Sequence, residues 1–291
     1  MNIPSASSRQ LDKNKLYHWP GFTPPQPQNA AASVAYFVTA VNNIGGTLSL
    51  LQAMKRHDTG AIVFSSTCAT YGIPAQLPIA EDTPQSPINP YGFTKLAAER
   101  MLADFDRAYG IRWTALRYFN AAGADPDGEL HERHDPETHA IPLAIQAALG
   151  MGPAFSVFGT DYATPDGTAI RDYVHVSDLA QAHARAIDYL AAGGASTALN
   201  LGTGIGTSVF EMIDAVAAAT GRPVPLVHGP RRAGDPPILY AVAERAKTVL
   251  GWVPRFVSIG ETVSTAVDSF MRIDESVRLL RAGSRNHDLA F

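Results

Sequence analysis

Apolar residues recur at helical spacing over residues 46–55 and then form an almost continuous run over residues 61–65. The first pattern is typical of an amphipathic helix, and the second is typical of a buried strand. Asn89 marks the start of a second expected helix that ends at Tyr109, and residues 113–117 form the next expected strand. Because a helix that joins two neighbouring strands is a crossover connection, we expect a parallel sheet.

Helices and strands continue to alternate in the rest of the chain, which favours a doubly wound α/β sheet. Helices are expected at residues 141–149, 176–190 and 208–219, and a strand is expected at residues 198–202. Two regions, about 123–172 and 223–256, are richer in proline and glycine and contain short strand-like runs. They indicate a second, smaller lobe.

The charge balance and the cysteine content narrow the possible partners and compartments. The chain of 291 residues has 23 Lys and Arg against 27 Asp and Glu, a net charge of −4. The chain has no excess of basic residues to attract nucleic acid or a negatively charged membrane surface, so neither is an expected partner. The single cysteine, Cys68, excludes an internal disulfide and a multi-cysteine metal site and fits a reducing compartment. With no apolar run near the ~20 residues that span a bilayer and no secretory signal, we expect a cytoplasmic protein.

Tyr91 and Lys95 are the first pair of residues that point to chemistry. Four residues apart on a helix, they share one face. A neighbouring ammonium group and the positive end of the helix dipole both favour the phenolate, which predicts a lowered pKa for Tyr91 and a tyrosine that can accept a proton. The alternative is an ordinary helix surface, because this spacing often arises by chance.

A cluster of hydroxyl groups at the end of the strand expected at residues 61–65 favours a catalytic role for Tyr91 and Lys95 over an ordinary helix surface. Ser65, Ser66 and Thr67 lie where the strand reaches the carboxyl edge of the sheet, the edge at which doubly wound folds bind ligands. Thr67 is therefore a candidate for hydrogen bonding to a substrate oxygen. The simpler alternative is that these hydroxyls satisfy backbone groups in a turn.

Four motifs, in order along the chain, resemble those of UDP-glucose 4-epimerases, which belong to the extended short-chain dehydrogenase/reductase group. They are Ser-Ser-Thr-Cys-Ala-Thr-Tyr-Gly at 65–72, Asn-Pro-Tyr-Gly-Phe-Thr-Lys at 89–95, Arg-Tyr-Phe-Asn-Ala-Ala-Gly-Ala at 117–124 and Arg-Asp-Tyr-Val-His-Val at 171–176. The similarity extends from about Asn42 to Trp252. Four ordered motifs are far more specific than one.

The resemblance implies a Rossmann-like doubly wound parallel sheet and a smaller C-terminal lobe that binds the UDP-sugar. The family's glycine-rich turn for the NAD pyrophosphate is not found, so we expect the N-terminal cofactor-binding strands to be missing. The expected division is an irregular arm at 1–30, a partial Rossmann-like domain at 31–122 plus 173–222, a substrate lobe at 123–172 plus 223–272, and a tail at 273–291.

The implied activity is an isomerase reaction, the NAD-dependent 4-epimerisation of a UDP-sugar through a 4-keto intermediate. Tyr91 removes the proton of the sugar 4-hydroxyl, and hydride passes from C4 to NAD and back to the other face of the sugar. Lys95 lowers the pKa of Tyr91 and holds the nicotinamide ribose, and Thr67 steadies the reacting oxygen. These three are the implied catalytic residues.

Further site residues are carried over from the matching motifs. The implied NAD-binding residues are Asn43, Ser65, Ser66, Tyr91, Lys95 and Tyr118. The implied substrate-binding residues are Thr67, Asn120, His139, Arg171, Tyr173, Arg232 and Asp235. The family also implies a homodimer, formed through the helix that carries Tyr91 and the helix before it.

Two other activities and two other sites remain as alternatives. The first alternative activity is that of a catalytically impaired remnant that binds UDP-sugar weakly. The second is that of a nucleotide-sugar dehydratase or decarboxylase. Dehydratases of this group have an acidic pair after the threonine, whereas Cys68 follows Thr67 here, which argues against a dehydratase. The glycines at 202–206 lack the spacing of a dinucleotide-binding loop. His131, His134 and His139 crowd around Asp135 and Glu137, but we expect no metal there because the matching motif accounts for the segment.

Overall fold

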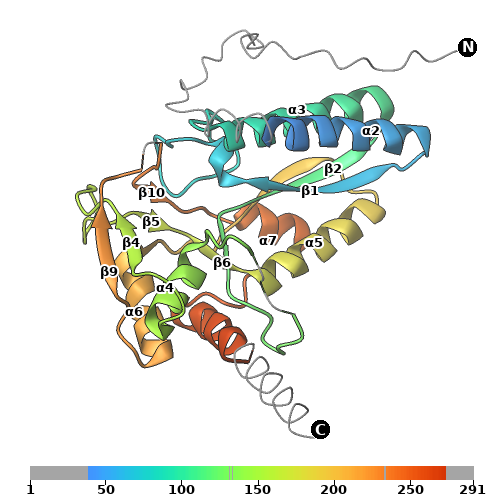
Figure 1. The fold of residues 1–291 in the computed structure, drawn as a ribbon. Helices are drawn as coiled ribbons and strands as arrows, with labels where there is room; N and C mark the ends of the chain where they lie inside the picture. Colours follow the sequence, from blue (N-terminus) through green and yellow to red (C-terminus); the bar gives the residue numbers. More distant parts are fainter. Residues whose placement is uncertain (1–38, 131, 133, 233, 273–291) are drawn as a thin grey trace, which may run out of the picture.

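The computed structural model describes residues 39–272 with the exception of 131, 133 and 233 (Figure 1). The expected arm at 1–30 and tail at 273–291 lie outside the described residues. Among the described residues, no helix combines the length and the apolar character needed to cross a membrane.

A three-stranded parallel sheet forms the first layer, as the crossover pattern predicts. The strands lie in the order β1 (Ala61–Thr67), β2 (Arg112–Tyr118) and β7 (Thr197–Leu201). Helices α2 (Gly46–Arg56) and α3 (Pro90–Tyr109) cover one face, and α5 (Val176–Ala191) and α7 (Glu244–Leu250) cover the other (Figure 1). A π-helix, η1 (Val41–Gly45), precedes α2, and a short 3-10 helix, η2 (Cys68–Thr70), follows β1.

Helix α3 has the boundaries that the sequence predicts, and its local signals explain them. The Asn89 side chain accepts a hydrogen bond from the Gly92 N–H at 2.8 Å, and Pro90 occupies the first turn. Gly110 ends the helix with a φ of 69°, a left-handed conformation that glycine adopts without strain. The predicted start and end of this helix are confirmed, so the position of Tyr91 in its first turn is fixed by local sequence.

The second layer is built from short strands and two amphipathic helices. Two pairs of strands are β3 (Asn120–Ala122) with β6 (Tyr173–His175), and β4 (Phe155–Phe158) with β9 (Leu226–Gly229). A three-stranded sheet has β5 (Ile170–Arg171) in the middle, between β10 (Ile238–Leu239) and β8 (Thr207–Ser208). Its helices are α4 (Ala140–Leu149) and α6 (Val209–Thr220), and residues 259–272 form the described part of another. Helix α6 begins with a capping box between Ser208 and Glu211.

Helix α6 packs in the second layer rather than against the parallel sheet. Its buried residues Met212 and Val216 share one apolar cluster with Ile145 of α4 and Val157 of β4. We therefore assign α6 to the second layer, whereas the sequence-based division places residues 173–222 in the first domain. A helix that follows a parallel strand usually returns to the same sheet, but here β8 turns the chain toward β5 before the helix starts.

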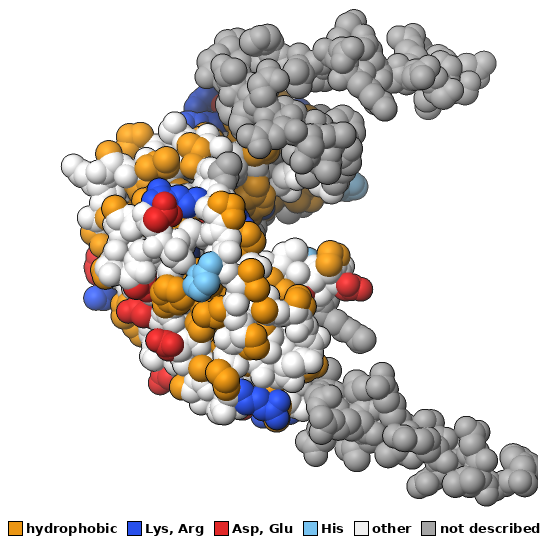
Figure 2. All heavy atoms as spheres, turned by 60° about the vertical axis from the view of Figure 1, so that its left-hand side comes forward, with side chains coloured by type: hydrophobic (Ala, Val, Ile, Leu, Met, Phe, Trp, Pro, Cys, Tyr) orange, Lys and Arg blue, Asp and Glu red, His pale blue; other side chains and the backbone are white. Residues whose placement is uncertain are grey.

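The apolar core of the first layer lies on both faces of the sheet. Leu116 and Leu199 pack with Trp252, whose indole N–H donates to the Asp178 carbonyl oxygen at 2.9 Å. On the other face, Leu51 of α2 packs with Leu102 of α3. Figure 2 shows one face of the molecule, on which acidic and basic side chains form small separate groups among hydrophobic and uncharged atoms.

Candidate active site

The structure brings Tyr91, Lys95 and Thr67 together where β1 ends and α3 begins. The Lys95 ammonium lies 5.8 Å from the centre of the Tyr91 ring and donates to the Ser65 carbonyl oxygen at 2.9 Å. The Thr67 hydroxyl lies close enough to the Tyr91 phenol to lower its pKa. Thr67 also accepts from the Ala69 N–H at 3.2 Å as the N-cap of η2. The predicted pairing of the hydroxyl cluster with the tyrosine and lysine is therefore present as a geometry.

The pKa of Tyr91 differs in direction from the sequence-based expectation. Desolvation by the surrounding protein raises the pKa of Tyr91, the nearby Tyr118 adds to the rise, and the hydrogen bond from Thr67 opposes it. Burial also lowers the pKa of Lys95. The ammonium group lies 5.8 Å from the centre of the Tyr91 ring, and a lowering of the Tyr91 pKa by Lys95 stays a prediction.

Ser65 and Ser66 point to opposite faces of the sheet, as successive strand residues must. The Ser65 hydroxyl lies 2.9 Å from Nε2 of His183 on α5, whose Nδ1 is 2.8 Å from the Leu179 carbonyl oxygen. The Ser66 hydroxyl instead donates to Glu99 on α3 and is buried. The Ser66 hydroxyl is therefore already bound inside the protein, and the assignment of Ser66 to the cofactor stays a prediction.

A cavity of about 230 Å³ opens beside Lys95, between α2, α3 and β1. Its polar lining includes Asn42, Asn43 and Thr47, and its apolar lining consists of Leu50, Ile62 and Phe64. The Asn43 amide donates to the Thr94 hydroxyl at 2.9 Å and so ties the helical segment before α2 to the first turn of α3. Tyr118, the last residue of β2, is in register with Thr67.

Four of the expected substrate-binding residues gather at the edge of the second layer. Arg171 and Asp235 form a hydrogen-bonded ion pair, and Arg171 also donates to the Ile170 carbonyl oxygen at 2.7 Å. Tyr173 follows two residues later and pairs in register with Asn120. Burial raises the pKa of Tyr173 to about 12, and the positive charge of Arg171 partly opposes this rise. Burial likewise raises the pKa of the Cys68 thiol to about 12, again opposed by Arg171.

Arg232 and His139 have other contacts. The Arg232 guanidinium lies 4.0 Å from the centre of the Phe158 ring. His139 precedes α4, and its Nδ1 lies 2.8 Å from Glu137 and 2.9 Å from Glu132. The Arg232 carbonyl oxygen accepts from the Asp235 N–H at 3.3 Å, so Arg232 lies beside the ion pair of Arg171 and Asp235 through its backbone.

The expected crowding of His134, Glu137 and His139 is present, with possible ligand atoms within 4.8 Å of one another. Oε1 of Glu137 already accepts from the Thr138 and His139 N–H groups at 2.7 and 2.8 Å. These bonds lower the pKa of Glu137 against the opposing effect of desolvation. The clustering is therefore explained by the hydrogen bonds of the Glu137 carboxylate to the two backbone N–H groups just before α4.

The glycine-rich loop at 202–206 surrounds a buried carboxylate. Asp172 accepts from the Thr203 N–H at 2.9 Å, from the Thr203 hydroxyl at 2.7 Å and from the Gly204 N–H at 3.3 Å. Burial raises the pKa of Asp172, and these hydrogen bonds oppose the rise. The backbone donors of this loop therefore serve an internal anion rather than a dinucleotide.

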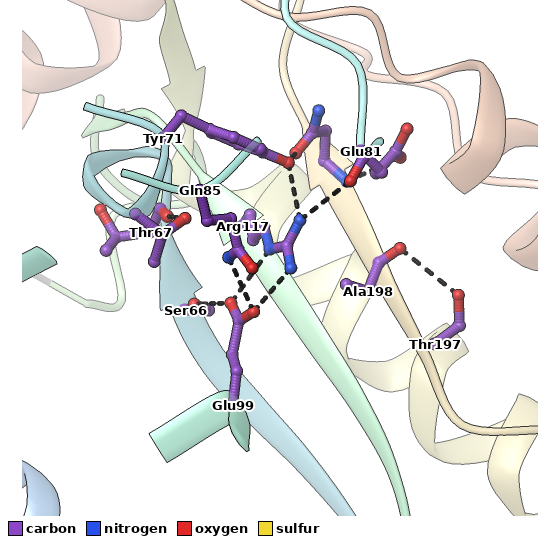
Figure 3. Close-up of polar contacts among 11 residues, drawn as sticks. Ser66, Thr67, Tyr71, Glu81, Gln85, Glu99, Arg117, Thr197 and Ala198 are labelled. Carbon is purple, nitrogen blue, oxygen red and sulfur yellow. Dashed lines mark hydrogen bonds and ion pairs between the residues drawn. The ribbon is translucent and has the colours of Figure 1, made fainter. Parts of the chain in front are cut away.

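Sequence reasoning missed a buried polar network directly behind the candidate site (Figure 3). Arg117 of β2 forms a two-fold hydrogen bond with Glu99 of α3, at 3.0 and 2.6 Å, and donates to the Tyr71 hydroxyl at 2.9 Å. The Tyr71 hydroxyl donates to Asn200 of β7 at 2.7 Å. The signal was an arginine within an otherwise apolar strand, because such a charge must find a buried partner.

Comparison with known proteins identifies the group to which this chain is related. Residues 26–202 match the model of the NAD dependent epimerase/dehydratase family. The chain belongs to this family. The match includes the end of the stretch 1–30, which we expected to be an irregular arm.

Individual members of the family are similar over most of the chain. UDP-glucose 4-epimerase of Rhizobium leguminosarum bv. trifolii is 54% identical over 227 residues, which are 78% of this chain and 69% of that protein. The crystal structure of the Brucella ovis UDP-glucose 4-epimerase in complex with NAD has 54% identity and a TM-score of 0.77, covering 79% of this chain and 71% of that one. The Bifidobacterium longum enzyme in complex with NAD⁺ and UDP has 37% identity and a TM-score of 0.78, covering 86% and 74%.

Proposed function

We propose that this chain is an isomerase that catalyses the NAD-dependent 4-epimerisation of a UDP-sugar of the UDP-glucose/UDP-galactose type. The observation that carries the proposal is the meeting of Tyr91, Lys95 and Thr67 at the carboxyl end of β1, next to a cavity. The similarity to UDP-glucose 4-epimerases supports it, since two of the related structures contain NAD.

The lining of the cavity fits part of such a cofactor. Amide groups of Asn42 and Asn43, the Thr47 hydroxyl and the Lys95 ammonium offer hydrogen bonds, and Ile62 and Phe64 offer an apolar surface for a ring. Its volume of about 230 Å³ is smaller than that of a pocket for a whole dinucleotide. We assign Asn43, Ser65, Tyr91, Lys95 and Tyr118 to the end of the cofactor that faces the sugar. When bound, NAD supplies a reversible hydride acceptor for the sugar C4.

The residues of the chain then handle the proton and the orientation of the sugar. Tyr91, once deprotonated, accepts the proton of the sugar 4-hydroxyl and returns it when the 4-keto sugar is reduced. The hydrogen bond from Thr67 favours the phenolate form of Tyr91, and the Thr67 hydroxyl lies next to the position that the reacting oxygen would occupy. Because the same phenol gives and takes the proton, the cycle is balanced.

The second layer is the proposed site of the UDP group. Arg171 and Arg232 would bind the diphosphate through their guanidinium forks, with Asn120 beside them, and Asp235 would accept a hydrogen bond from a ribose hydroxyl. Tyr173 and His139 complete the proposed substrate-binding set. Since Arg171 and Asp235 are paired with each other in the structure, the substrate must exchange at least one of these bonds.

The test is the release of bound nucleotide from the purified protein, followed by an assay that interconverts UDP-glucose and UDP-galactose. We expect stoichiometric NAD, and Tyr91→Phe is expected to reduce kcat by about 10² to 10⁴-fold, the usual contribution of a general base. Tyr109→Phe, at the exposed far end of α3, is the matched control. Protein that contains neither NAD nor activity would contradict the proposal, as would a fully active Tyr91→Phe variant.

We further propose a homodimer formed through α2 and α3. These helices expose Leu48, Leu50 and Tyr109, large apolar side chains that a neighbouring subunit would cover. Light scattering of the purified protein gives the mass that decides this point.

A further inference from the structure

A straight row of buried polar side chains crosses the parallel sheet immediately beneath the candidate site. Ser66 of β1 is in register with Arg117 of β2, which is in register with Asn200 of β7. All three are buried. The next row toward the carboxyl edge contains Thr67 and Tyr118, which are both proposed site residues. The polar row therefore precedes the row of proposed site residues by one residue along each strand.

Helix α3 binds to this part of the sheet through three successive turns. Tyr91, Lys95 and Glu99 are spaced by four residues and so share one face of the helix. They reach three consecutive residues of β1: Tyr91 lies beside Thr67, Lys95 donates to the Ser65 carbonyl oxygen, and Glu99 accepts from the Ser66 hydroxyl. Glu99 is the member of this set that lies deepest in the protein.

The Glu99 carboxylate has a complete set of donors from three directions. Oε1 accepts from Ser66 and from Nε of Arg117 at 3.0 Å, and Oε2 accepts from Nη2 of Arg117 at 2.6 Å and from Gln85 at 3.0 Å. A two-fold bond between a guanidinium and a carboxylate fixes both distance and angle. Because Arg117 is also bound to Tyr71, Glu99 connects α3 to a framework that extends across the sheet (Figure 3).

We propose that Glu99 and Arg117 are positioning residues that hold the first turns of α3 against β1 and so set the position of Tyr91 and Lys95 relative to Thr67. Neither residue touches the cavity beside Lys95, and the opposite charges of the pair offset each other. The pair thus acts through geometry rather than through its field. For the reaction, this inference rests on the proposed function, but the placement of the helix is measurable without it.

The first measurement compares kcat and KM of wild type with those of Glu99→Gln, which keeps the shape of the side chain but removes its charge. A misplacement of about 1 Å can reduce a rate by about 100-fold, so kcat is expected to fall by that order while KM for the UDP-sugar changes little. Asp178→Asn is the matched control, since Asp178 is a buried carboxylate that binds the Arg255 and Phe256 N–H groups elsewhere in the first layer. Its kcat is expected to remain that of wild type.

The second measurement is amide hydrogen exchange, which needs no activity. Glu99→Gln is expected to speed exchange in residues 92–99 while exchange in α4 stays as in wild type; Asp178→Asn should instead affect residues 255–256. If Glu99→Gln does not fold, the double variant Glu99→Leu, Arg117→Met removes both charges and keeps the volume apolar, and it should show the same local change. Unchanged exchange in residues 92–99, or an equal rise in α4, overturns the proposal. A wild-type protein without epimerase activity would contradict the proposed function only, and the exchange data would still decide the role of Glu99.

Discussion

Two polar clusters of the molecule are built in different ways. Behind Tyr91, Glu99 and Arg117 are almost completely buried, with side-chain exposures of 4% and 6%. In the second layer, the Arg171 and Asp235 side chains form an ion pair with exposures of 11% and 33%. The first cluster has donors and acceptors matched inside the protein, and the second retains access to solvent. A buried pair fixes geometry, whereas a half-exposed pair can exchange its partner for a ligand.

The two clusters also differ in what a lost partner leaves behind. In the buried cluster an unpaired charge cannot be solvated, so its cost approaches that of ion desolvation. In the second cluster Asp235 is one-third exposed, so water can replace part of the lost partner and the cost is smaller than in the buried cluster. The comparison therefore predicts a large stability effect behind Tyr91 and a binding effect in the second layer.

The largest expected effect is on stability, from Glu99→Ala. This change leaves the Arg117 guanidinium buried with only neutral partners, and the free energy of unfolding is expected to fall by about 3–5 kcal/mol. The matched change in the other cluster, Asp235→Ala, is expected to cost less than about 1 kcal/mol. Chemical denaturation of both variants checks the difference, and equal losses would show that burial does not distinguish the two pairs.

The helices and strands of the first layer were largely predictable because their signals are local. Asn89, Pro90 and Gly110 determine both ends of α3, and the apolar runs at β1 and β2 determine the parallel sheet. The motifs around Tyr91 and Lys95 likewise led to the family.

What the sequence could not give depends on contacts between distant segments. The packing of α6 on α4 follows from the pairing of β8 with β5, which no local pattern specifies. The direction of the Tyr91 pKa shift depends on burial and on the neighbouring Tyr118 side chain. Strand alternation places Ser66 on the same face of the sheet as Ile62 and Phe64, but it does not show that the Ser66 hydroxyl is bound to Glu99.

The second effect in size concerns binding by the half-exposed pair. Arg171→Ala is expected to weaken the affinity for UDP by about 10- to 100-fold, because a hydrogen bond between a charged donor and a phosphate contributes about 1.5–3 kcal/mol. Stability should change little, as water replaces the guanidinium. Isothermal titration of UDP gives the affinity.

The control for this variant is Arg185→Ala. The Arg185 guanidinium binds the Leu250 and Gly251 carbonyl oxygens at 3.1 and 2.8 Å and has no part in the proposed site. Its loss should leave UDP binding unchanged. If Arg171→Ala also leaves it unchanged, Arg171 serves only the ion pair with Asp235.

The smallest effect tests a buried titratable group that forms no ion pair with any other described residue. His175 is fully buried; its Nδ1 accepts from the Ser177 N–H at 3.1 Å as the N-cap of α5, and its Nε2 lies 3.0 Å from the Thr265 hydroxyl. Because Nδ1 accepts, the imidazole is neutral with its proton on Nε2. Burial lowers the pKa of His175, the charge of Asp178 opposes this, and Arg255 adds to it.

The sign of the pH dependence follows from that direction. A histidine whose pKa is lower in the folded state takes up its proton first in the unfolded chain, so stability is lost as pH falls below the unfolded pKa of about 6.5. The loss is at most about 1.4 kcal/mol per pH unit until the folded pKa is reached.

Unfolding free energies at about pH 7.5 and about pH 5.5 should show a smaller drop for His175→Asn than for wild type, because Asn keeps an N-cap acceptor but cannot titrate. Ser208→Ala, which removes the cap of α6, should cost about 1 kcal/mol equally at both pH values. If His175→Asn keeps the full pH dependence of the wild type, the titration belongs to other groups, and a buried group without a counter-charge is no more pH-sensitive here than the paired residues behind Tyr91.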